Sequence, residues 1–164
     1  MSEGDMSDED TMIEELYCIK NSGNIMEEDF LFYLSSKYPS VRALAVIVVG
    51  LNLKKEFACK HIVKAIDSEC DEEVVQSLVD SLVSLVHAGI CDKKIVASKL
   101  KKLLVFGCWS DELKGGLYLG LLKLFKKITP REYAIAPDCL SEMSLDVDFI
   151  ESIPLVNGDK GCES

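Results

Sequence analysis

Apolar residues recur at intervals of three and four along most of the chain, and short polar turns separate the segments that carry them. This spacing places apolar side chains on one face of an α-helix, whereas a half-buried strand would alternate every second residue. No segment shows sustained alternation, so we predict an all-α protein of about eight or nine helices. The long predicted helices lie near residues 8–21, 26–36, 39–52, 54–66, 71–88, 91–106 and 110–127.

Residues at the ends of these segments support the helix boundaries. The first segment opens with acidic residues and is followed by Gly23, and Gly89 and Gly107 fall in later gaps. Glycine is favoured just past the end of a helix because it adopts a left-handed backbone without strain. Residues 129–132, "TPRE", combine a capping threonine, a proline at the first helical position and a glutamate two residues later, which predicts the start of a helix.

Three of the predicted helices share one apolar register. "PSVRALAVIVVGL" (39–51), "EEVVQSLVDSLVSL" (72–85) and "DELKGGLYLGLLKL" (111–124) align with offsets of 33 and 39 residues. The register begins at Val41, Val74 and Leu113. The positions that we predict to be buried are Val41, Ala45, Val49, Leu78, Leu82, Leu117 and Leu121. Each offset accommodates two helices and two turns, and a recurrence in this range is typical of helical solenoids.

The first of these helices resembles the second helix of a HEAT repeat, in which a proline turn precedes Val-Arg and then small and apolar residues. The resemblance implies that Arg42 lies at the helix start and bonds to an acidic residue of the next repeat, such as Asp71 or Glu72. It extends over about residues 26–127 and weakens along the chain, because Val75 and Lys114 replace the arginine. An ordinary α-bundle with coincidental amphipathicity is the alternative.

The solenoid interpretation organises the chain as one domain over residues 1–153. A capping helix at about 8–21 precedes repeats at about 26–127, and capping helices at about 130–153 follow; Asp146 is the predicted cap of the last short helix. Residues 154–164, "PLVNGDKGCES", are rich in polar residues and glycine and are expected to form a flexible tail.

The seven cysteines favour a reducing compartment. They are odd in number and scattered, without a CxxC pair, and most lie within apolar segments, where a free thiol behaves as a small hydrophobic group. Zinc is the alternative, with Cys59, His61 and Cys70 as the one close grouping, but this spacing matches no common ligand pattern. No apolar run is long enough to span a bilayer and the acidic N-terminus does not resemble a signal peptide, so we expect a cytoplasmic protein without a membrane contact.

Charge is distributed unevenly along the chain. Residues 1–73 hold 16 acidic and 7 basic side chains, residues 74–136 hold 5 and 10, and residues 137–164 hold 7 and 1. A net charge of −10 argues against a nucleic-acid partner, which requires a continuous basic surface. The lysines at 93, 94, 99, 101 and 102 are interpreted as a solvated helix face, with a local anion site as the alternative.

The turn at 67–73, "DSECDEE", places five carboxylates in seven residues. These carboxylates either stabilise the start of the next helix through its dipole or form a patch that steers a basic partner. Helical spacing extends this patch along a polar stripe of Gln76, Asp80, Ser84 and His87, on a face predicted to mix apolar and polar residues. The predicted partner-binding residues are Asp67, Glu69, Asp71, Glu72, Glu73, Gln76 and Asp80.

No constellation of catalytic, metal-binding or cofactor-binding residues stands out, so we expect a non-enzymatic protein without a cofactor. A small acidic α-solenoid of this kind resembles immunity proteins of bacterial polymorphic-toxin and contact-dependent inhibition systems. The resemblance implies a protein-binding module that neutralises a basic, nuclease-type toxin. The alternative is a HEAT-like accessory lyase or chaperone that handles a cofactor or a maturing protein, with a pocket around Cys108, Trp109 and Tyr118.

Overall fold

The computed structural model describes residues 7–156 of the chain, and these residues contain nine α-helices and no strand. The prediction of an all-α protein is therefore confirmed. The helices are α1 (Asp8–Ser22), α2 (Glu27–Leu34), α3 (Pro39–Val46), α4 (Ala58–Ala65), α5 (Glu72–His87), α6 (Lys93–Phe106), α7 (Asp111–Leu124), α8 (Pro130–Ala134) and α9 (Val147–Ser152). A π-helical segment, η1 (Ile47–Asn52), continues α3, and a short 3₁₀ turn, η2 (Leu140–Glu142), precedes α9.

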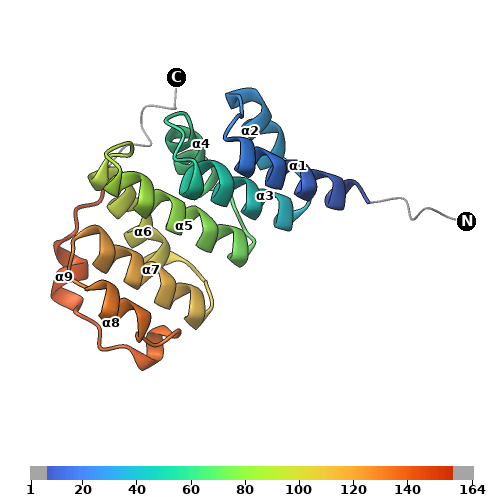
Figure 1. The fold of residues 1–164 in the computed structure, drawn as a ribbon. Helices are drawn as coiled ribbons and strands as arrows, with labels where there is room; N and C mark the ends of the chain where they lie inside the picture. The colour runs from blue at the N-terminus through green and yellow to red at the C-terminus, as the bar shows by residue number, and fades with distance from the viewer. Residues whose placement is uncertain (1–6, 157–164) are drawn as a thin grey trace, which may run out of the picture.

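The helices form two layers (Figure 1). Helices α1, α3, α5 and α7 lie side by side in one layer, and α2, α4 and α6 lie behind them. Helix α5 packs between α3 and α7, while α2, α4 and α6 each pack on the front helix that follows them in the chain. The prediction that the three aligned helices lie next to one another is thus confirmed. The HEAT-like solenoid remains an interpretation of this arrangement.

The core lies between the two layers and follows the predicted register. The seven positions that the alignment predicts to be buried are all fully buried: Val41, Ala45, Val49, Leu78, Leu82, Leu117 and Leu121. Burial of apolar surface is the main favourable term in folding, so the shared register accounts for the way in which α3, α5 and α7 align.

Local capping fixes most helix boundaries. The side chains of Ser7, Asp71, Asp92, Ser110 and Thr129 accept hydrogen bonds from backbone N–H groups in the first turns of α1, α5, α6, α7 and α8. Gly23 ends α1 in a left-handed conformation with φ of 74°. These caps satisfy backbone groups that have no partner within the helix.

The predicted helix at 39–52 is not one regular α-helix, because its second half winds as the π-helix η1. At this point α5 approaches closely: a Cβ atom added to Gly50 would lie 3.0 Å from Cβ of Ser81 and 2.9 Å from Cδ1 of Ile62. The hydroxyl of buried Ser81 donates a hydrogen bond of 3.1 Å to the carbonyl oxygen of Val46. The π-helical turn therefore sits where α3 and α5 are in tightest contact.

Arg42 joins the first helix pair to the second, as the HEAT resemblance implies, but the expected partner is wrong. Its guanidinium binds Glu69 through Nε and Nη2, each at 3.0 Å from a carboxylate oxygen, and binds the carbonyl of Ser36 at 2.8 Å. Asp71 and Glu72, the expected partners, have other roles. Glu69 also accepts hydrogen bonds from the backbone N–H groups of residues 70 and 71, so it holds the turn as well as the arginine.

The C-terminal segment packs against α6 and α7. The rings of Phe125 and Phe149 meet edge to face at a centroid distance of 5.4 Å. The amide N–H of Val156 donates to the hydroxyl of Ser98 at 2.8 Å. Of the predicted flexible tail, Val156 is therefore in contact with α6, and residues 157–164 lie outside the described residues.

Cys59 and Cys91 form a disulfide between α4 and the turn before α6. The expectation of free thiols is therefore wrong for these two residues. Four other cysteines, Cys18, Cys70, Cys108 and Cys139, are free. The spacing of the two residues does not predict this pair, because they are 32 positions apart and meet through the stacking of helices.

Reduction of this disulfide is expected to lower the free energy of unfolding by about 2–4 kcal/mol, because the bond restricts a long loop of the unfolded chain. Urea titrations with and without a thiol reductant would measure the change. A Cys59→Ser/Cys91→Ser double variant should be insensitive to the reductant, and Cys18→Ser, at an exposed free thiol, should behave like the parent protein. Equal unfolding midpoints for the parent protein in both conditions would contradict the expectation.

Candidate functional site

The carboxylates of the acidic turn mostly bind other parts of the chain. Both carboxylate oxygens of Asp67 accept hydrogen bonds from Nζ of Lys99, at 2.8 and 2.6 Å. Glu69 binds Arg42, and its side chain is only 11% exposed. Burial by itself would raise the pKa of Glu69, but the hydrogen bonds from Arg42 and from the backbone N–H of Asp71 outweigh it and lower the pKa. These two carboxylates connect neighbouring helix pairs.

The remaining carboxylates of the turn lie at the start of α5. Asp71 caps the helix by accepting hydrogen bonds from the N–H groups of Glu73 and Val74. Glu72 accepts hydrogen bonds from the hydroxyl and the amide of Ser110, the cap of α7. Within residues 7–156 the carboxylate of Glu73 has no hydrogen-bond or ion-pair partner. The carboxylates of this turn thus mainly connect helices and cap α5, and their role in partner binding stays a prediction.

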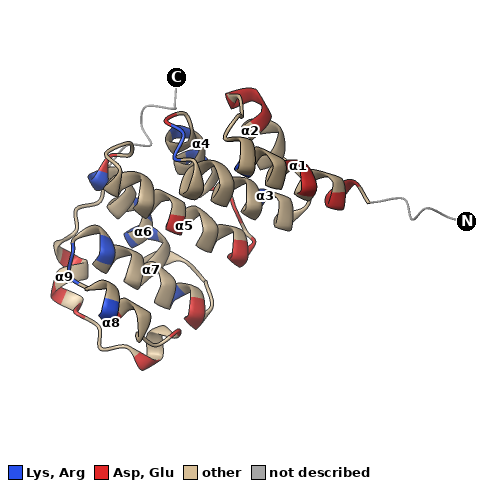
Figure 2. Ribbon diagram, viewed as in Figure 1, with Lys and Arg blue, Asp and Glu red and all other residues tan. Residues whose placement is uncertain are grey.

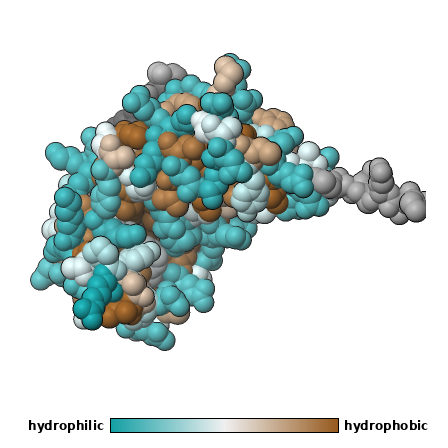
Figure 3. All heavy atoms as spheres, in the orientation of Figure 1, coloured by the Kyte–Doolittle hydropathy of each residue, from teal (hydrophilic) through white to brown (hydrophobic). Residues whose placement is uncertain are grey.

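Gln76 and Asp80 share one face of α5, as the predicted stripe requires. The Gln76 side-chain amide donates to the Asp80 carboxylate at 2.9 Å. Burial raises the pKa of Asp80, and the hydrogen bond from Gln76 and the charge of Lys123 oppose this effect. The ammonium group of Lys123 lies 3.8 Å from the ring centroid of Tyr133. Brown hydrophobic and teal hydrophilic residues are mixed over the face of the molecule seen in Figure 3.

The pocket expected around Cys108, Trp109 and Tyr118 does not form with all three residues. Cys108 and Trp109 line a cavity of about 400 Å³ beside the α6–α7 turn. Tyr118 is buried elsewhere, on α7, where its hydroxyl oxygen accepts a hydrogen bond from the backbone N–H of Asp146. The alternative of a cofactor-handling pocket therefore loses one of the three residues on which it was based.

The zinc alternative is also not supported by the side-chain placement. Cys59 is engaged in the disulfide, and Nε2 of His61 lies 2.6 Å from the Glu27 carboxylate. The side chains of residues 7–156 form no cluster of three or more histidine, cysteine and carboxylate groups suited to a metal ion. In the same part of the chain, no helix combines the length and the apolar character needed to cross a bilayer.

The predicted lysine face on α6 contacts other segments of the protein. Lys99 binds Asp67, and Nζ of Lys101 donates to the carbonyl oxygen of Ile153 at 2.7 Å. Lys93 lies over the ring of Phe125, with Nζ 4.4 Å from the ring centroid. Lys101 thus helps to attach the C-terminal segment to α6, whereas Lys99 contacts the α4–α5 turn and Lys93 contacts the end of α7. The interpretation of these lysines as a solvated face is therefore incomplete.

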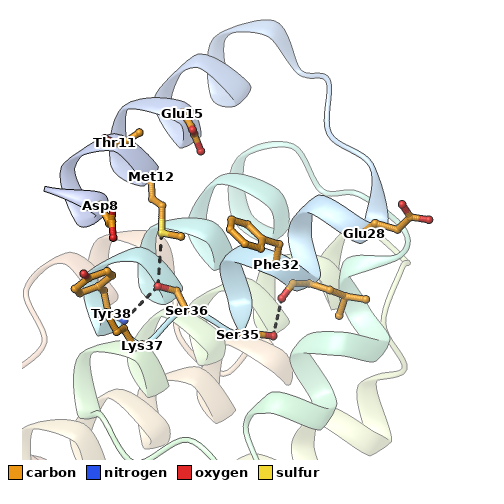
Figure 4. A pocket seen from close by; sticks show the side chains of 11 residues that line it. Asp8, Thr11, Met12, Glu15, Glu28, Phe32, Ser35, Ser36, Lys37 and Tyr38 are labelled. Atoms are coloured by element: carbon orange, nitrogen blue, oxygen red, sulfur yellow. Dashed lines mark hydrogen bonds between the residues drawn. The ribbon is translucent and has the colours of Figure 1, made fainter. Parts of the chain in front are cut away.

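A groove that the sequence did not reveal lies between α1 and α2 (Figure 4). Its volume is about 850 Å³. One wall consists of Asp8, Thr11, Met12 and Glu15 from α1. The other consists of Glu28, Leu31 and Phe32 from α2 and of residues 35–38, which follow α2. The groove exists because α1 and α2 each pack mainly on α3 rather than on one another, which leaves their facing sides partly open.

Hydrogen bonds fix the antiparallel arrangement of the α1 wall and the segment opposite it. From the middle of α1 toward its start, the bonded pairs are Glu15 with Tyr33, Met12 with Ser36, and Glu9 with Ser40. Residue numbers thus fall along α1 while they rise along the opposing segment. Burial, and then the hydrogen bond to Glu15, raise the pKa of Tyr33, so its hydroxyl remains a donor at neutral pH.

The groove combines exposed apolar side chains with an acidic rim. Phe32 is 59% exposed and Leu31 is 38% exposed, and the ring of Phe32 extends from α2 toward α1 (Figure 4). Three carboxylates, from Asp8, Glu15 and Glu28, line the groove together with one ammonium group, from Lys37. The acidic residues of α1 and α2 appear as red segments in Figure 2.

Several carboxylates near the groove are not neutralised by the protein itself. Asp8, Glu14, Glu28 and Asp29 make neither ion pairs nor side-chain hydrogen bonds with any other residue in the range 7–156. This distinguishes α1 and α2 from the 67–73 turn, where four of the five carboxylates have partners within the chain. A sequence signal existed: residues 8–15 and 28–35 each place acidic and apolar residues on one helical face, which could equally have been interpreted as core-facing.

No protein-family model matches the chain, and neither a curated protein sequence nor a solved structure is significantly similar to it.

Proposed function

We propose that this protein is a protein-binding module whose partner presents a basic surface. The observation that carries the proposal is the α1–α2 surface, where exposed apolar side chains lie beside carboxylates that have no partner within residues 7–156. Large exposed apolar side chains that are bordered by charge are typical of protein-interaction sites. The carboxylates supply long-range attraction to a basic partner, and Leu31 and Phe32 supply apolar area that is buried on contact.

The more specific form of the proposal is an immunity protein that occludes a basic, nuclease-type toxin in the cytoplasm. The net charge of −10 supports this form, because nuclease domains carry basic surfaces for their phosphate substrates. An acidic inhibitor gains association rate from this complementarity. The resemblance in size and charge to immunity proteins suggests the class of partner, while the groove suggests where that partner binds.

The product of the reading frame immediately upstream of this gene is the first partner to test. Co-expression of the two proteins should yield a complex that survives purification, and this chain should restore growth to cells that produce the partner. An upstream protein that neither binds the chain nor inhibits growth would argue against the immunity form of the proposal.

Charge reversal in the groove should slow association with such a partner. Glu28→Lys is expected to reduce the association rate constant by about three- to tenfold at low salt and to flatten its salt dependence. Glu112→Lys is a matched control, because both glutamates are exposed and lie in the first turn of a helix. Stopped-flow measurements at several salt concentrations would give the rates. Equal effects of the two substitutions would contradict a binding role for the groove.

The predicted site at the 67–73 turn can be tested in the same assay. Neutralising Asp71, Glu72 and Glu73 together removes a helix cap and the contact with Ser110, which should cost about 0.5–2 kcal/mol of stability for the cap alone. If the turn also forms the rim of the binding surface, association slows as well. A change in stability with unchanged association would assign the turn to structure alone.

A further inference from the structure

Both walls of the α1–α2 groove present residues at helical spacing. Residues 8, 11, 12 and 15 of α1 line one wall at positions i, i+3, i+4 and i+7. Residues 28, 31 and 32 of α2 line the other at positions i, i+3 and i+4, and residues 35–38, which follow α2, continue it. The α1 wall is about 10 Å long, because each helical residue advances 1.5 Å. On both walls the central positions carry the larger apolar groups, Met12 on α1 and Leu31 and Phe32 on α2, and acidic residues lie toward the ends.

We propose that this groove binds an amphipathic helix of the partner, with apolar side chains at i, i+3 or i+4, and i+7 and with lysine or arginine beside them. The inference rests on the proposed function, because it specifies how the basic partner is recognised. A helix laid into an apolar groove is recognised through side chains at this same spacing. Two turns of such a helix match the length of the groove walls.

Charge complementarity selects this occupant over others. Three carboxylates and one ammonium group line the groove, and α1 and α2 each have three acidic residues in their first turn. A second copy of this chain would bring like charges together, which is unfavourable. A partner that adds a β-strand requires an exposed sheet edge, and residues 7–156 contain no strand. A basic helix satisfies both the apolar centre and the acidic rim.

Met12 and Phe32 are the side chains best placed to contact the bound helix. The sulfur of Met12 accepts a hydrogen bond from the hydroxyl of Ser36 at 3.8 Å, which helps to position this flexible side chain in the α1 wall of the groove. Phe32 packs edge to face against Tyr33, with ring centroids 5.4 Å apart, and Tyr33 is in turn held by Glu15. The exposed ring of Phe32 is therefore held in place before any partner binds.

Two synthetic peptides and the full-length protein provide the test. The first peptide carries leucines on one helical face and lysines elsewhere, and the second has the same composition with a shuffled order that removes the apolar face. Fluorescence anisotropy titrations should show the first peptide binding at least about tenfold more tightly than the second, since apolar anchors supply most of the binding energy.

Matched variants assign the binding to the groove. Phe32→Ala should weaken binding of the first peptide by about tenfold, whereas Phe106→Ala, at a phenylalanine that is 70% exposed on α6, should change it by less than about twofold. Leu31→Ala is a second groove variant in case Phe32→Ala alters the fold, which circular dichroism would show.

The outcomes separate the inference from the proposed function. Equal affinity of the two peptides, or equal losses for Phe32→Ala and Phe106→Ala, would overturn the helix-binding groove. In either of these cases, Glu28→Lys could still weaken the binding of both peptides more than Glu112→Lys does. The acidic surface and the proposed function would then stand. If neither peptide bound, or if the two charge reversals had the same effect, the proposed function would fail together with the inference.

Discussion

Replacing Arg42 by methionine is expected to lower the free energy of unfolding by about 3–5 kcal/mol, because it leaves the nearly buried carboxylate of Glu69 without its partner. The guanidinium makes three hydrogen bonds, two to Glu69 and one to the carbonyl of Ser36. The side chains of Arg42 and Glu69 are only 19% and 11% exposed, so water cannot replace these bonds. Methionine retains most of the apolar volume of the arginine side chain, so the change in stability reports the loss of the charge and its hydrogen bonds rather than a loss of packing.

Urea titrations at neutral pH would measure this effect. Arg131→Met is the control, because Arg131 is exposed on α8 and its replacement should change stability by no more than about 0.5 kcal/mol. Similar values for the two variants would mean that the Arg42–Glu69 pair contributes little to stability and that the turn is held by other contacts.

The effect of Arg42→Met should depend on pH. The pKa of Glu69 is lowered in the folded protein, so its ion pair contributes stability above the unfolded pKa of about 4.3. This contribution is lost as the pH falls through the lower folded-state pKa. The difference between parent and variant should therefore be largest near neutral pH and should narrow below about pH 4. A difference that stays constant into strong acid would contradict this role for Glu69.

The partner of Arg42 illustrates where sequence reasoning reached its limit. The HEAT resemblance implied an arginine that bonds to an acidic residue of the next repeat, and in the structure Arg42 binds Glu69 in the turn before α5. The choice among the carboxylates of the 67–73 turn depends on the path of the turn. Asp71 is required as the cap of α5 and Glu72 faces Ser110, so Glu69 is the carboxylate that remains directed toward Arg42.

The π-helical turn η1 could not be predicted, because residues 43–51 contain no polar side chain whose spacing would indicate the number of residues per helical turn. Residues 43–51 are apolar apart from Gly50, so the α-helical and π-helical windings bury the same residues. The deciding contact is tertiary: Ser81 of α5 binds the carbonyl of Val46, and Gly50 leaves room for α5 to approach. π-Helical turns of this kind often arise where a neighbouring element inserts a hydrogen bond into a helix.

The α1–α2 groove was missed for a different reason. The pattern of residues 8–36 predicts amphipathic helices but does not show which apolar residues of each helix pack on the core. Leu16 and Phe30 are indeed fully buried. Each helix has a second partly apolar face, however, and α3 can accept only one face of each. Phe32 and Leu31 therefore remain exposed, a result of helix placement that periodicity alone does not determine.

Replacing Leu82 by alanine is expected to lower the free energy of unfolding by about 3–5 kcal/mol, in the upper part of the range for buried leucines. Leu82 is fully buried on α5, and α5 packs between α3 and α7 in the front layer while α4 and α6 pack against it from behind. The cavity left by the substitution cannot close by a shift of one neighbour, because each neighbour is held by further contacts. The lost methyl groups therefore leave both a cavity and unpaired packing surfaces.

Urea titration provides the measurement, and the slope of the transition should not change because the same surface is exposed on unfolding. Leu145→Ala is the control, since Leu145 is 42% exposed in the segment before α9, and it should cost less than about 1 kcal/mol. A loss for Leu82→Ala as small as that of the control would show that α5 is not the central helix of the stack. It would also remove the shared register of α3, α5 and α7 as the basis of the fold. A large loss together with an unchanged slope would instead support α5 as the centre of the hydrophobic core.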